Sequence, residues 1–155
     1  MRILMVCLGN ICRSPIAEGV MQHKIKEHGL GWVVSSAGTE SYHVGEAPQP
    51  WSQKVCRDHG IDISHQRSVK FTKNDLYNYD KIYAMATDVY EEMRRIVGYK
   101  ADMSNVDLFL NELHPGQNES VPDPYGGPEY EYEFVYELVD ATCNAIIKKY
   151  KTPHV

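Results

Sequence analysis

A cysteine and an arginine six positions apart mark the stretch that most constrains this chain. Cys7 follows the short apolar run 3–6, and Arg13 is followed by Ser14 and Pro15. The apolar run has the length of a buried strand. A proline suits the first position of a helix, because its missing N–H would have stayed unpaired there. The pattern C-x5-R-S therefore predicts a strand, a tight loop and a helix, with the cysteine where the loop begins.

The residues between this cysteine and the helix have the composition of a cradle for an oxyanion. Backbone N–H groups at a helix N-terminus point towards a bound anion, and the helix dipole adds partial positive charge. Gly9 and Asn10 tolerate the positive φ that a tight loop needs. The planar guanidinium of Arg13 matches two phosphate oxygens at once. The predicted phosphate-binding residues are Leu8, Gly9, Asn10, Ile11, Cys12, Arg13 and Ser14.

The same surroundings favour the thiolate form of Cys7. Amide donors, a guanidinium and a helix N-terminus all stabilise negative charge on sulfur, and the thiolate is the nucleophilic form of cysteine. The hydroxyl of Ser14 can donate to this sulfur and help it leave in a second step. A lone cysteine at a strand end is commonly a small buried residue. The prediction of a nucleophile therefore depends on the whole pattern.

Segments along nearly the whole chain resemble one known family. Residues 7–15, CLGNICRSP, are similar to the signature of the low-molecular-weight protein tyrosine phosphatases, and the similarity extends to 35–39, 64–67 and 123–125. The resemblance implies a phosphotyrosine-protein phosphatase that forms a phosphocysteine intermediate and also hydrolyses small aryl phosphates. It implies no cofactor and no metal. The implied partners are tyrosine-phosphorylated proteins, with a cognate tyrosine kinase as a further candidate.

The resemblance also implies roles for residues outside the loop. The hydroxyl of Ser36 is the candidate partner of the Asn10 amide, and His65 is expected to be a hydrogen-bonding post in the same network. Tyr42 and Tyr125 are expected to form walls of the substrate cleft, where a phenol ring can stack on an aromatic substrate. Locally, a serine at a strand end and two loop tyrosines need no function. The expected supporting network comprises Asn10, Ser14, Ser36 and His65.

Asp123 lies between two prolines in a long polar loop. A departing phenolate needs a proton, and a carboxyl group that reaches the cleft can supply it. We predict that Asp123 protonates the leaving phenol and then deprotonates the water that hydrolyses the phosphocysteine. An Asp-Pro pair is commonly just a turn, so this prediction depends on the C-x5-R-S pattern. The predicted catalytic residues are Cys7, Arg13 and Asp123.

Cys12 lies inside the predicted cradle and has two interpretations. It is either a small buried side chain that keeps the loop compact, or the partner of Cys7 in a reversible disulfide that protects the nucleophile from overoxidation.

Two positions depart from the family pattern. Ala86 stands where the family usually has aspartate, and Gly126 stands where many relatives have a second aromatic residue. No role is therefore carried over to Asp88, and control through paired tyrosines is not expected.

Composition bounds the class of protein. A chain of 155 residues predicts one domain over residues 1–155. The net charge of −5 argues against a nucleic-acid partner. No apolar run is long enough for a membrane span, and the N-terminus leads directly into a strand without a secretory segment. The four cysteines, at positions 7, 12, 56 and 143, fit neither a zinc pattern nor a disulfide framework. A catalytic thiol needs a reducing compartment, so the expected location is cytoplasmic.

Alternating strands and helices predict an α/β fold. Strands are expected over 3–6, 32–37, 81–86 and 105–110, and helices over 15–28, 50–59, 89–97 and 129–149. Right-handed crossovers then give a four-stranded parallel sheet with helices on both faces, a flavodoxin-like doubly wound domain. Ligands bind such sheets at the carboxyl ends of the strands, where Cys7 falls. The expected apolar face of the last helix comprises Phe134, Leu138, Ala141 and Ala145.

Three other functions fit parts of the pattern. Protein arginine phosphatases resemble this chain in fold and cradle, but they have threonine at the position of Ile11 and often phenylalanine at that of Tyr125, so phosphotyrosine is favoured. Arsenate reductases of similar fold need two further cysteines close together, whereas Cys56 and Cys143 are far apart. A catalytically silent phosphate-binding module would not need the acid Asp123.

Overall fold

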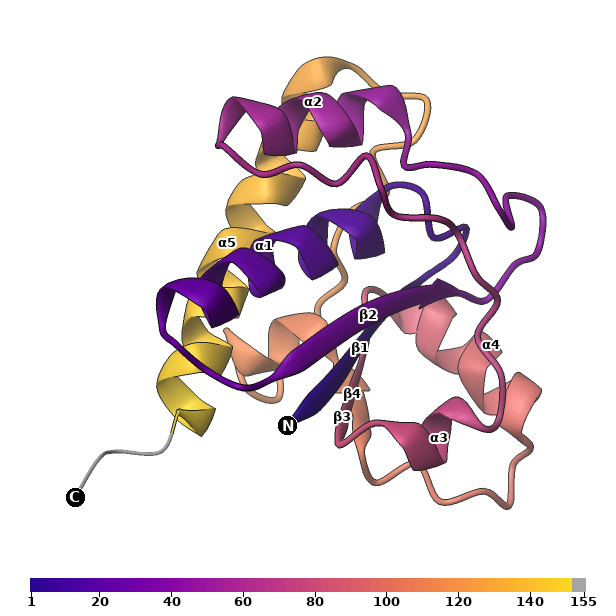
Figure 1. The fold of residues 1–155 in the computed structure, drawn as a ribbon. Coiled ribbons are helices and arrows are strands. Elements are labelled where there is room, and N and C mark those ends of the chain that lie inside the picture. Colours follow the sequence, from indigo (N-terminus) through magenta and orange to yellow (C-terminus); the bar gives the residue numbers. More distant parts are fainter. Residues whose placement is uncertain (152–155) are drawn as a thin grey trace.

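The structure is a computed structural model that describes residues 1–151. Its four strands form one parallel sheet in the order β2-β1-β3-β4 (Figure 1). Their bounds are β1 Arg2–Cys7, β2 Val33–Gly38, β3 Lys81–Ala84 and β4 Val106–Leu108. The predicted α/β fold with a four-stranded parallel sheet is confirmed. The strand that ends at Cys7 is one of the two central strands, as the sheet order requires.

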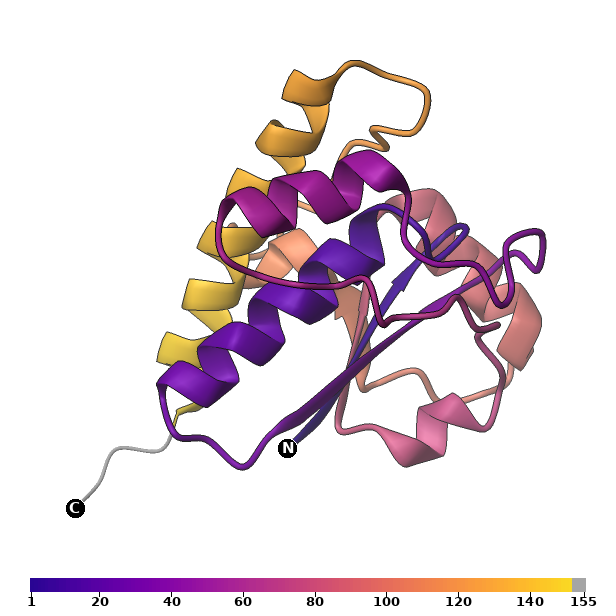
Figure 2. The same cartoon turned by 45° about the horizontal axis from the view of Figure 1, so that its top comes forward.

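Helices cover both faces of the sheet (Figure 2). Their bounds are α1 Arg13–Glu27, α2 Pro50–Asp58, α3 Asp75–Asn78, α4 Thr87–Val97 and α5 Glu129–Tyr150. Side chains of α1, α2 and α5 pack with Ile3 and Met5 on one face, whereas those of α3 and α4 pack with Leu4 and Val6 on the other. Successive residues of a strand point to opposite faces, so a strand covered on both sides is apolar throughout.

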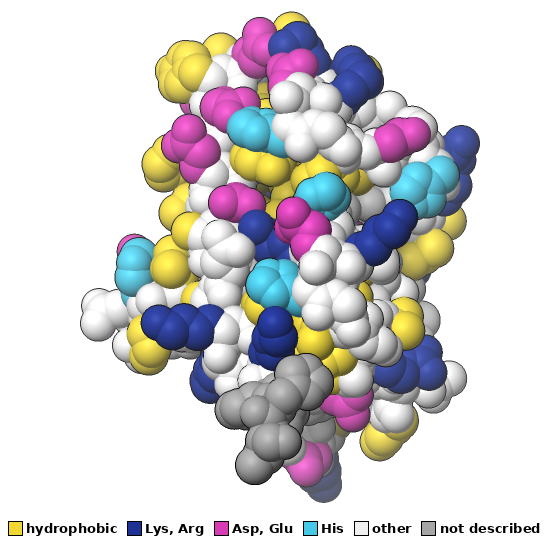
Figure 3. Space-filling view, turned by 60° about the vertical axis from the view of Figure 1, so that its left-hand side comes forward, with side chains coloured by type: hydrophobic (Ala, Val, Ile, Leu, Met, Phe, Trp, Pro, Cys, Tyr) yellow, Lys and Arg dark blue, Asp and Glu magenta, His cyan; other side chains and the backbone are white. Residues whose placement is uncertain are grey.

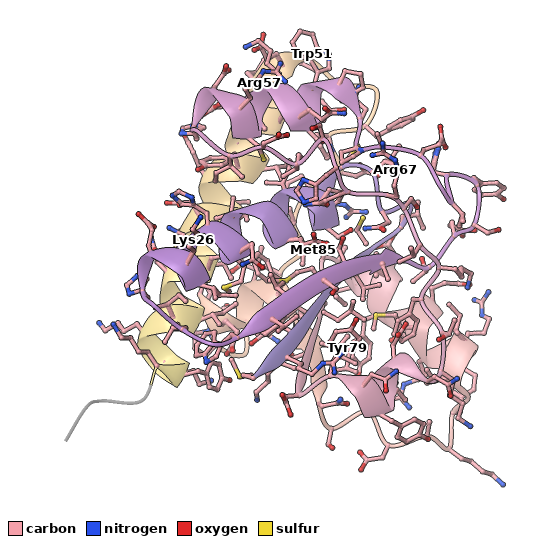
Figure 4. All side chains as sticks on the ribbon, viewed as in Figure 1. Lys26, Trp51, Arg57, Arg67, Tyr79 and Met85 are labelled. Carbon is pink, nitrogen blue, oxygen red and sulfur yellow. The ribbon has the colours of Figure 1, made fainter. Side chains whose placement is uncertain are left out.

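The helix α2 lies outermost on its side of the sheet. Trp51 near its start and Arg57 near its end both point away from the sheet (Figure 4). Its inner residues Val55 and Cys56 are buried in the core shared with α1 and α5. The start of the helix contacts the loop between β1 and α1, where Ser52 donates to the backbone oxygen of Cys12.

Ion pairs join the helices on this face, where acidic, basic and histidine side chains alternate (Figure 3). They are Lys24–Asp140 at 2.8 Å, Lys54–Glu129 at 2.6 Å and His59–Glu133 at 2.8 Å. The ring of His59 also stacks on that of Tyr136, with the ring centroids 3.9 Å apart. These contacts fix α5 against α1 and α2. The loop that precedes α5 is thereby held near the carboxyl end of β1.

The apolar face predicted for α5 is wrong. Phe134 is 51% exposed, and Leu138 is only partly buried. The buried face is Tyr132, Val135, Tyr136, Val139, Thr142, Cys143, Ile146 and Ile147. Tyrosine, threonine and cysteine contribute to this face, and an assignment based on phenylalanine and aliphatic residues gives them too little weight.

The fourth strand is shorter than predicted. It ends at Leu108, and a 3-10 helix, Phe109–Glu112, follows. The carboxylate of Asp107 accepts hydrogen bonds from the Leu108 N–H and from the Asn111 amide. Such local bonds compete with the regular pairing of a strand. No helix among residues 1–151 is long and apolar enough to cross a membrane.

Candidate active site

The predicted cradle lies between β1 and α1. Cys7 is the last residue of β1 and is 2% exposed, and Arg13 is the first residue of α1. The helix thus begins two residues before Pro15, its predicted first residue. Asn10 has a φ of +58°, as predicted for a tight loop. The N-terminus of α1 therefore faces the space in front of the sulfur.

The structure gives Gly9 a different role from the one predicted. Its φ is not among the positive values of the chain. A Cβ atom added at Gly9 would lie 3.0 Å from Cδ2 of His43, which is closer than ordinary packing allows. Glycine at this position therefore lets the 39–50 loop approach the cradle.

The side chain of Asn10 holds the cradle in shape. Its amide nitrogen donates to the hydroxyls of Ser14 at 2.7 Å and Ser36 at 2.9 Å, and its oxygen accepts from the backbone N–H of Val69 at 3.0 Å. The hydroxyl of Ser14 lies 3.0 Å from the sulfur of Cys7. All the polar groups of this amide are satisfied within the protein, as a buried amide requires.

Glu18 continues this network, a role that was not predicted from the sequence. The hydroxyl of Ser36 donates to its carboxylate at 2.7 Å. Burial raises the pKa of Glu18, whereas the Ser36 hydrogen bond and the nearby His65 oppose that rise. Glu18 lies four residues after Ser14 on the same helix, so helical spacing was the signal that could have identified it.

His65 was predicted to belong to the network but lies on the surface. Within residues 1–151 no hydrogen bond joins it to Asn10, whose oxygen is occupied by the Val69 N–H. Its loop is held instead by Arg67, labelled in Figure 4, which donates to the backbone oxygens of Ser64 and Gln66 at 2.7 Å each. His65 therefore lies near Glu18 without a hydrogen bond to Asn10.

Arg13 connects the cradle to the loop that carries Asp123. Its guanidinium is 4% exposed, donates to the backbone oxygen of Val121 at 3.1 Å, and lies 3.7 Å from the carboxylate of Asp123. The N–H of Val121 donates to the backbone oxygen of Met85, just beyond the end of β3. These contacts bring Asp123 to the mouth of the cradle from 110 positions along the chain.

A cavity of about 200 Å³ opens in front of Cys7. It is lined by Cys7, Leu8, Gly9, Ile11, Cys12, Arg13, Glu40, Tyr42, His43, Asp123 and Tyr125. The side chains of Tyr42 and Tyr125 are mostly exposed and form part of its rim. Glu40 and His43 were not predicted from the sequence to line this cavity. The ring of His43 lies 6.3 Å from that of Tyr125 and is hydrogen-bonded to Glu46.

Cys12 is a buried thiol in the wall of the cavity. Its sulfur lies 3.9 Å from the hydroxyl of Tyr132, and its backbone oxygen accepts from Ser52. Burial raises the pKa of Cys12 to about 12, so this thiol is protonated at neutral pH. All four cysteines are free thiols. Within residues 1–151 no group of three or more histidine, cysteine, aspartate or glutamate side chains is placed to hold a metal ion.

In this parallel α/β sheet a cysteine lies at the end of a strand, an arginine closes the loop that follows it, and a carboxyl group faces that loop. This arrangement is typical of the cysteine-dependent phosphatases. A family model described as "Low molecular weight phosphotyrosine protein phosphatase" matches residues 2–153. The chain belongs to this family of enzymes.

Individual relatives cover nearly the whole chain. The low molecular weight phosphotyrosine protein phosphatase of Gallus gallus is 34% identical over 155 residues, covering 98% of this chain and 95% of its own length. The crystal structure of a protein tyrosine phosphatase from Entamoeba histolytica matches with a TM-score of 0.88 and 34% identity, over 97% of each chain. A structure of the arginine phosphatase YwlE, a variant with a phosphorylated active-site serine, matches with a TM-score of 0.88 and 25% identity, over 99% and 98% of the two chains.

Proposed function

We propose that this enzyme hydrolyses phosphotyrosine in proteins through a phosphocysteine intermediate, and that it also hydrolyses small aryl phosphates. The observation that carries the proposal is the placement of the Cys7 sulfur at the base of a cavity with an arginine, a carboxyl group and two tyrosine rings around it. The cavity suits a flat aromatic ring whose phosphate reaches the cradle.

In the first step the thiolate of Cys7 attacks phosphorus, and the bond from phosphorus to the phenolic oxygen breaks. The carboxyl group of Asp123 gives its proton to that oxygen. The amides of residues 8–14 and the guanidinium of Arg13 stabilise the charge on the other phosphate oxygens. Arg13 already lies 3.7 Å from Asp123, so one side chain contacts both the cradle and the acid.

In the second step a water molecule attacks the phosphocysteine, and Asp123 takes its proton. The sulfur–phosphorus bond breaks, and the sulfur leaves as a thiolate. The Ser14 hydroxyl, 3.0 Å from this sulfur, can donate a hydrogen bond to the departing charge. The relative YwlE, with its phosphorylated active-site serine, supports a covalent intermediate at the nucleophile position.

Phosphoarginine is the second candidate substrate, because YwlE is an arginine phosphatase of the same fold. Ile11 and Tyr125 line the cavity of this chain, where an apolar side chain and a tyrosine ring can pack against a flat phenyl ring. Parallel assays on phosphotyrosine and phosphoarginine peptides separate the two. Faster hydrolysis of phosphotyrosine and of p-nitrophenyl phosphate is the expected result. Exclusive hydrolysis of phosphoarginine would contradict the proposal.

The proposed partners are tyrosine-phosphorylated proteins and the kinase that phosphorylates them. A Cys7→Ser variant retains the cradle and should hold its substrates, so a pull-down from the native lysate identifies them. All four cysteines are free thiols, and a thiol nucleophile must stay reduced to act. We therefore propose that the enzyme is located in the cytoplasm, which is a reducing compartment.

A further inference from the structure

A second hollow shares Asp123 with the candidate active site. It has a volume of about 450 Å³ and lies between residues 122–124 and the first turns of α5. Figure 2 shows how the loop that carries these residues runs into the upper end of α5. Its lining residues are Pro122, Asp123, Pro124, Tyr130, Glu131, Phe134 and Val135. We call this hollow the α5 groove. One carboxyl group thus borders both spaces, so a ligand of sufficient length can occupy both.

The walls of the α5 groove include apolar side chains that the core does not use. Tyr130 is 72% exposed and Phe134 is 51% exposed, although both belong to a helix whose opposite face is buried. Pro122 and Pro124 form the facing wall. Aromatic side chains exposed together beside a catalytic cavity are typical of a binding surface. The groove therefore suits an apolar side chain of a ligand.

Carboxylate side chains are frequent in the part of the chain that lines the α5 groove. Residues 101–147 contain no lysine or arginine but ten aspartates and glutamates. Near the groove, Glu129 is paired with Lys54, and Glu133 is paired with His59. Glu131 lines the groove and makes no ion pair within residues 1–151. Its carboxylate is available to a cation on a ligand.

We propose that the α5 groove binds the substrate polypeptide beside its phosphotyrosine, and that it selects an apolar side chain next to a lysine or arginine. The inference rests on the proposed function, because it places the phosphotyrosine in the cavity of Cys7. Continuity through Asp123 makes a neighbouring segment of the same polypeptide the occupant of the groove. The free carboxylate of Glu131 explains the choice of a basic neighbour, since opposite charges attract across a partly buried surface.

The test measures kcat/KM on a set of phosphotyrosine peptides, each of which has a single Leu-Lys pair. Across the set, the pair stands at each of three positions before the phosphotyrosine and at each of three positions after it. One placement should raise kcat/KM at least about fivefold over a serine-glycine background, because it buries a leucine side chain. The matching Leu-Glu peptide should be slower than the Leu-Lys peptide. That difference should shrink between 50 and 500 mM NaCl because salt screens exposed charges.

Two variants locate the effect. Phe134→Ser should abolish most of the leucine effect, and Glu131→Gln should abolish the preference for lysine over glutamate. Both should hydrolyse p-nitrophenyl phosphate at the wild-type rate, since neither residue lines the cavity of Cys7. The matched controls are Tyr99→Ser, an exposed aromatic residue outside the groove, and Glu137→Gln, an exposed carboxylate further along α5. These controls should retain both preferences.

The outcomes separate this inference from the proposed function. Equal kcat/KM for all placements, a preference for glutamate, or preferences unchanged in both groove variants would overturn the inference while hydrolysis of p-nitrophenyl phosphate stands. A wild-type enzyme that hydrolyses neither p-nitrophenyl phosphate nor any phosphotyrosine peptide would overturn the proposed function instead.

Discussion

The two sides of the active-site cavity are built differently. The cradle side, residues 7–14, has its cysteine, asparagine, arginine and serine almost fully buried and hydrogen-bonded. The acid side, residues 121–127, is mostly exposed after Val121, and Asp123 is 44% exposed. Groups that stabilise charge work best when they are fixed before the reaction. Asp123, which we propose as the proton donor, must instead meet leaving groups of different substrates, so an exposed loop suits it.

The two sides are joined at few points. Val121 is tied to the backbone of Met85 and to the guanidinium of Arg13, and Asp123 is tied to that same guanidinium. Beyond Val121, the loop is stiffened by its prolines and by the Tyr125 N–H, which donates to Asp123. The comparison implies that changes in the cradle affect every substrate, whereas changes in the loop affect substrates unequally.

The largest expected effect is that of Cys7→Ser. Without the thiolate no phosphocysteine can form, so turnover of p-nitrophenyl phosphate should fall by about 10⁴-fold or more. The variant should still bind phosphotyrosine peptides, which calorimetry measures. Turnover close to the wild-type rate would mean that the cradle does not supply the nucleophile.

Asp123→Asn tests the acid side. The loss of the proton donor should lower kcat by about 10²–10⁴-fold on phosphotyrosine peptides. The loss should be smaller on p-nitrophenyl phosphate, whose phenolate leaves without full protonation. Measuring kcat across aryl phosphates of graded phenol acidity checks this. An equal loss for every leaving group would remove the proposed distinction between the two sides.

Ser14→Ala tests the cradle with a smaller change. Removal of a hydrogen bond to a charged sulfur costs about 1.5–3 kcal/mol, or roughly ten- to a hundredfold in rate. The departure of the thiolate should slow most, so phosphocysteine should accumulate and give a burst of product in rapid-mixing experiments. A loss of rate without a burst would show that Ser14 acts before the intermediate forms.

The smallest effect concerns Glu18. Burial raises the pKa of Glu18 in the folded state, so at pH 4 its carboxyl group is mostly neutral. As the pH rises through that pKa, the carboxyl group ionises, and the buried charge lowers the free energy of unfolding. Glu18→Gln retains an acceptor for Ser36 without the charge. Relative to the wild type, its melting temperature should therefore rise by about 1–3 °C between pH 4 and pH 7. Scanning calorimetry at several pH values measures the difference, and a difference independent of pH would contradict the role of burial.

Local sequence patterns were enough to predict the strand, cradle and helix around Cys7. The residues of the cradle are neighbours in the chain, and each is suited to its place by its own chemistry, as Asn10 shows with its positive φ. The parallel sheet was also predictable, because strands alternate with helices. The signal for Glu18 was present as helical spacing from Ser14, but no single residue pointed to it.

The sequence by itself determined the strand, tight loop and helix around Cys7, because these depend on contacts within a few residues. Only the tertiary structure decided that Glu18 rather than His65 continues the network, that His43 packs closely against Gly9, and that Phe134 stays outside the core. These outcomes depend on how separate helices and loops pack against one another. Such packing depends on how well the surfaces of whole helices and loops fit one another. A short stretch of sequence does not contain this information.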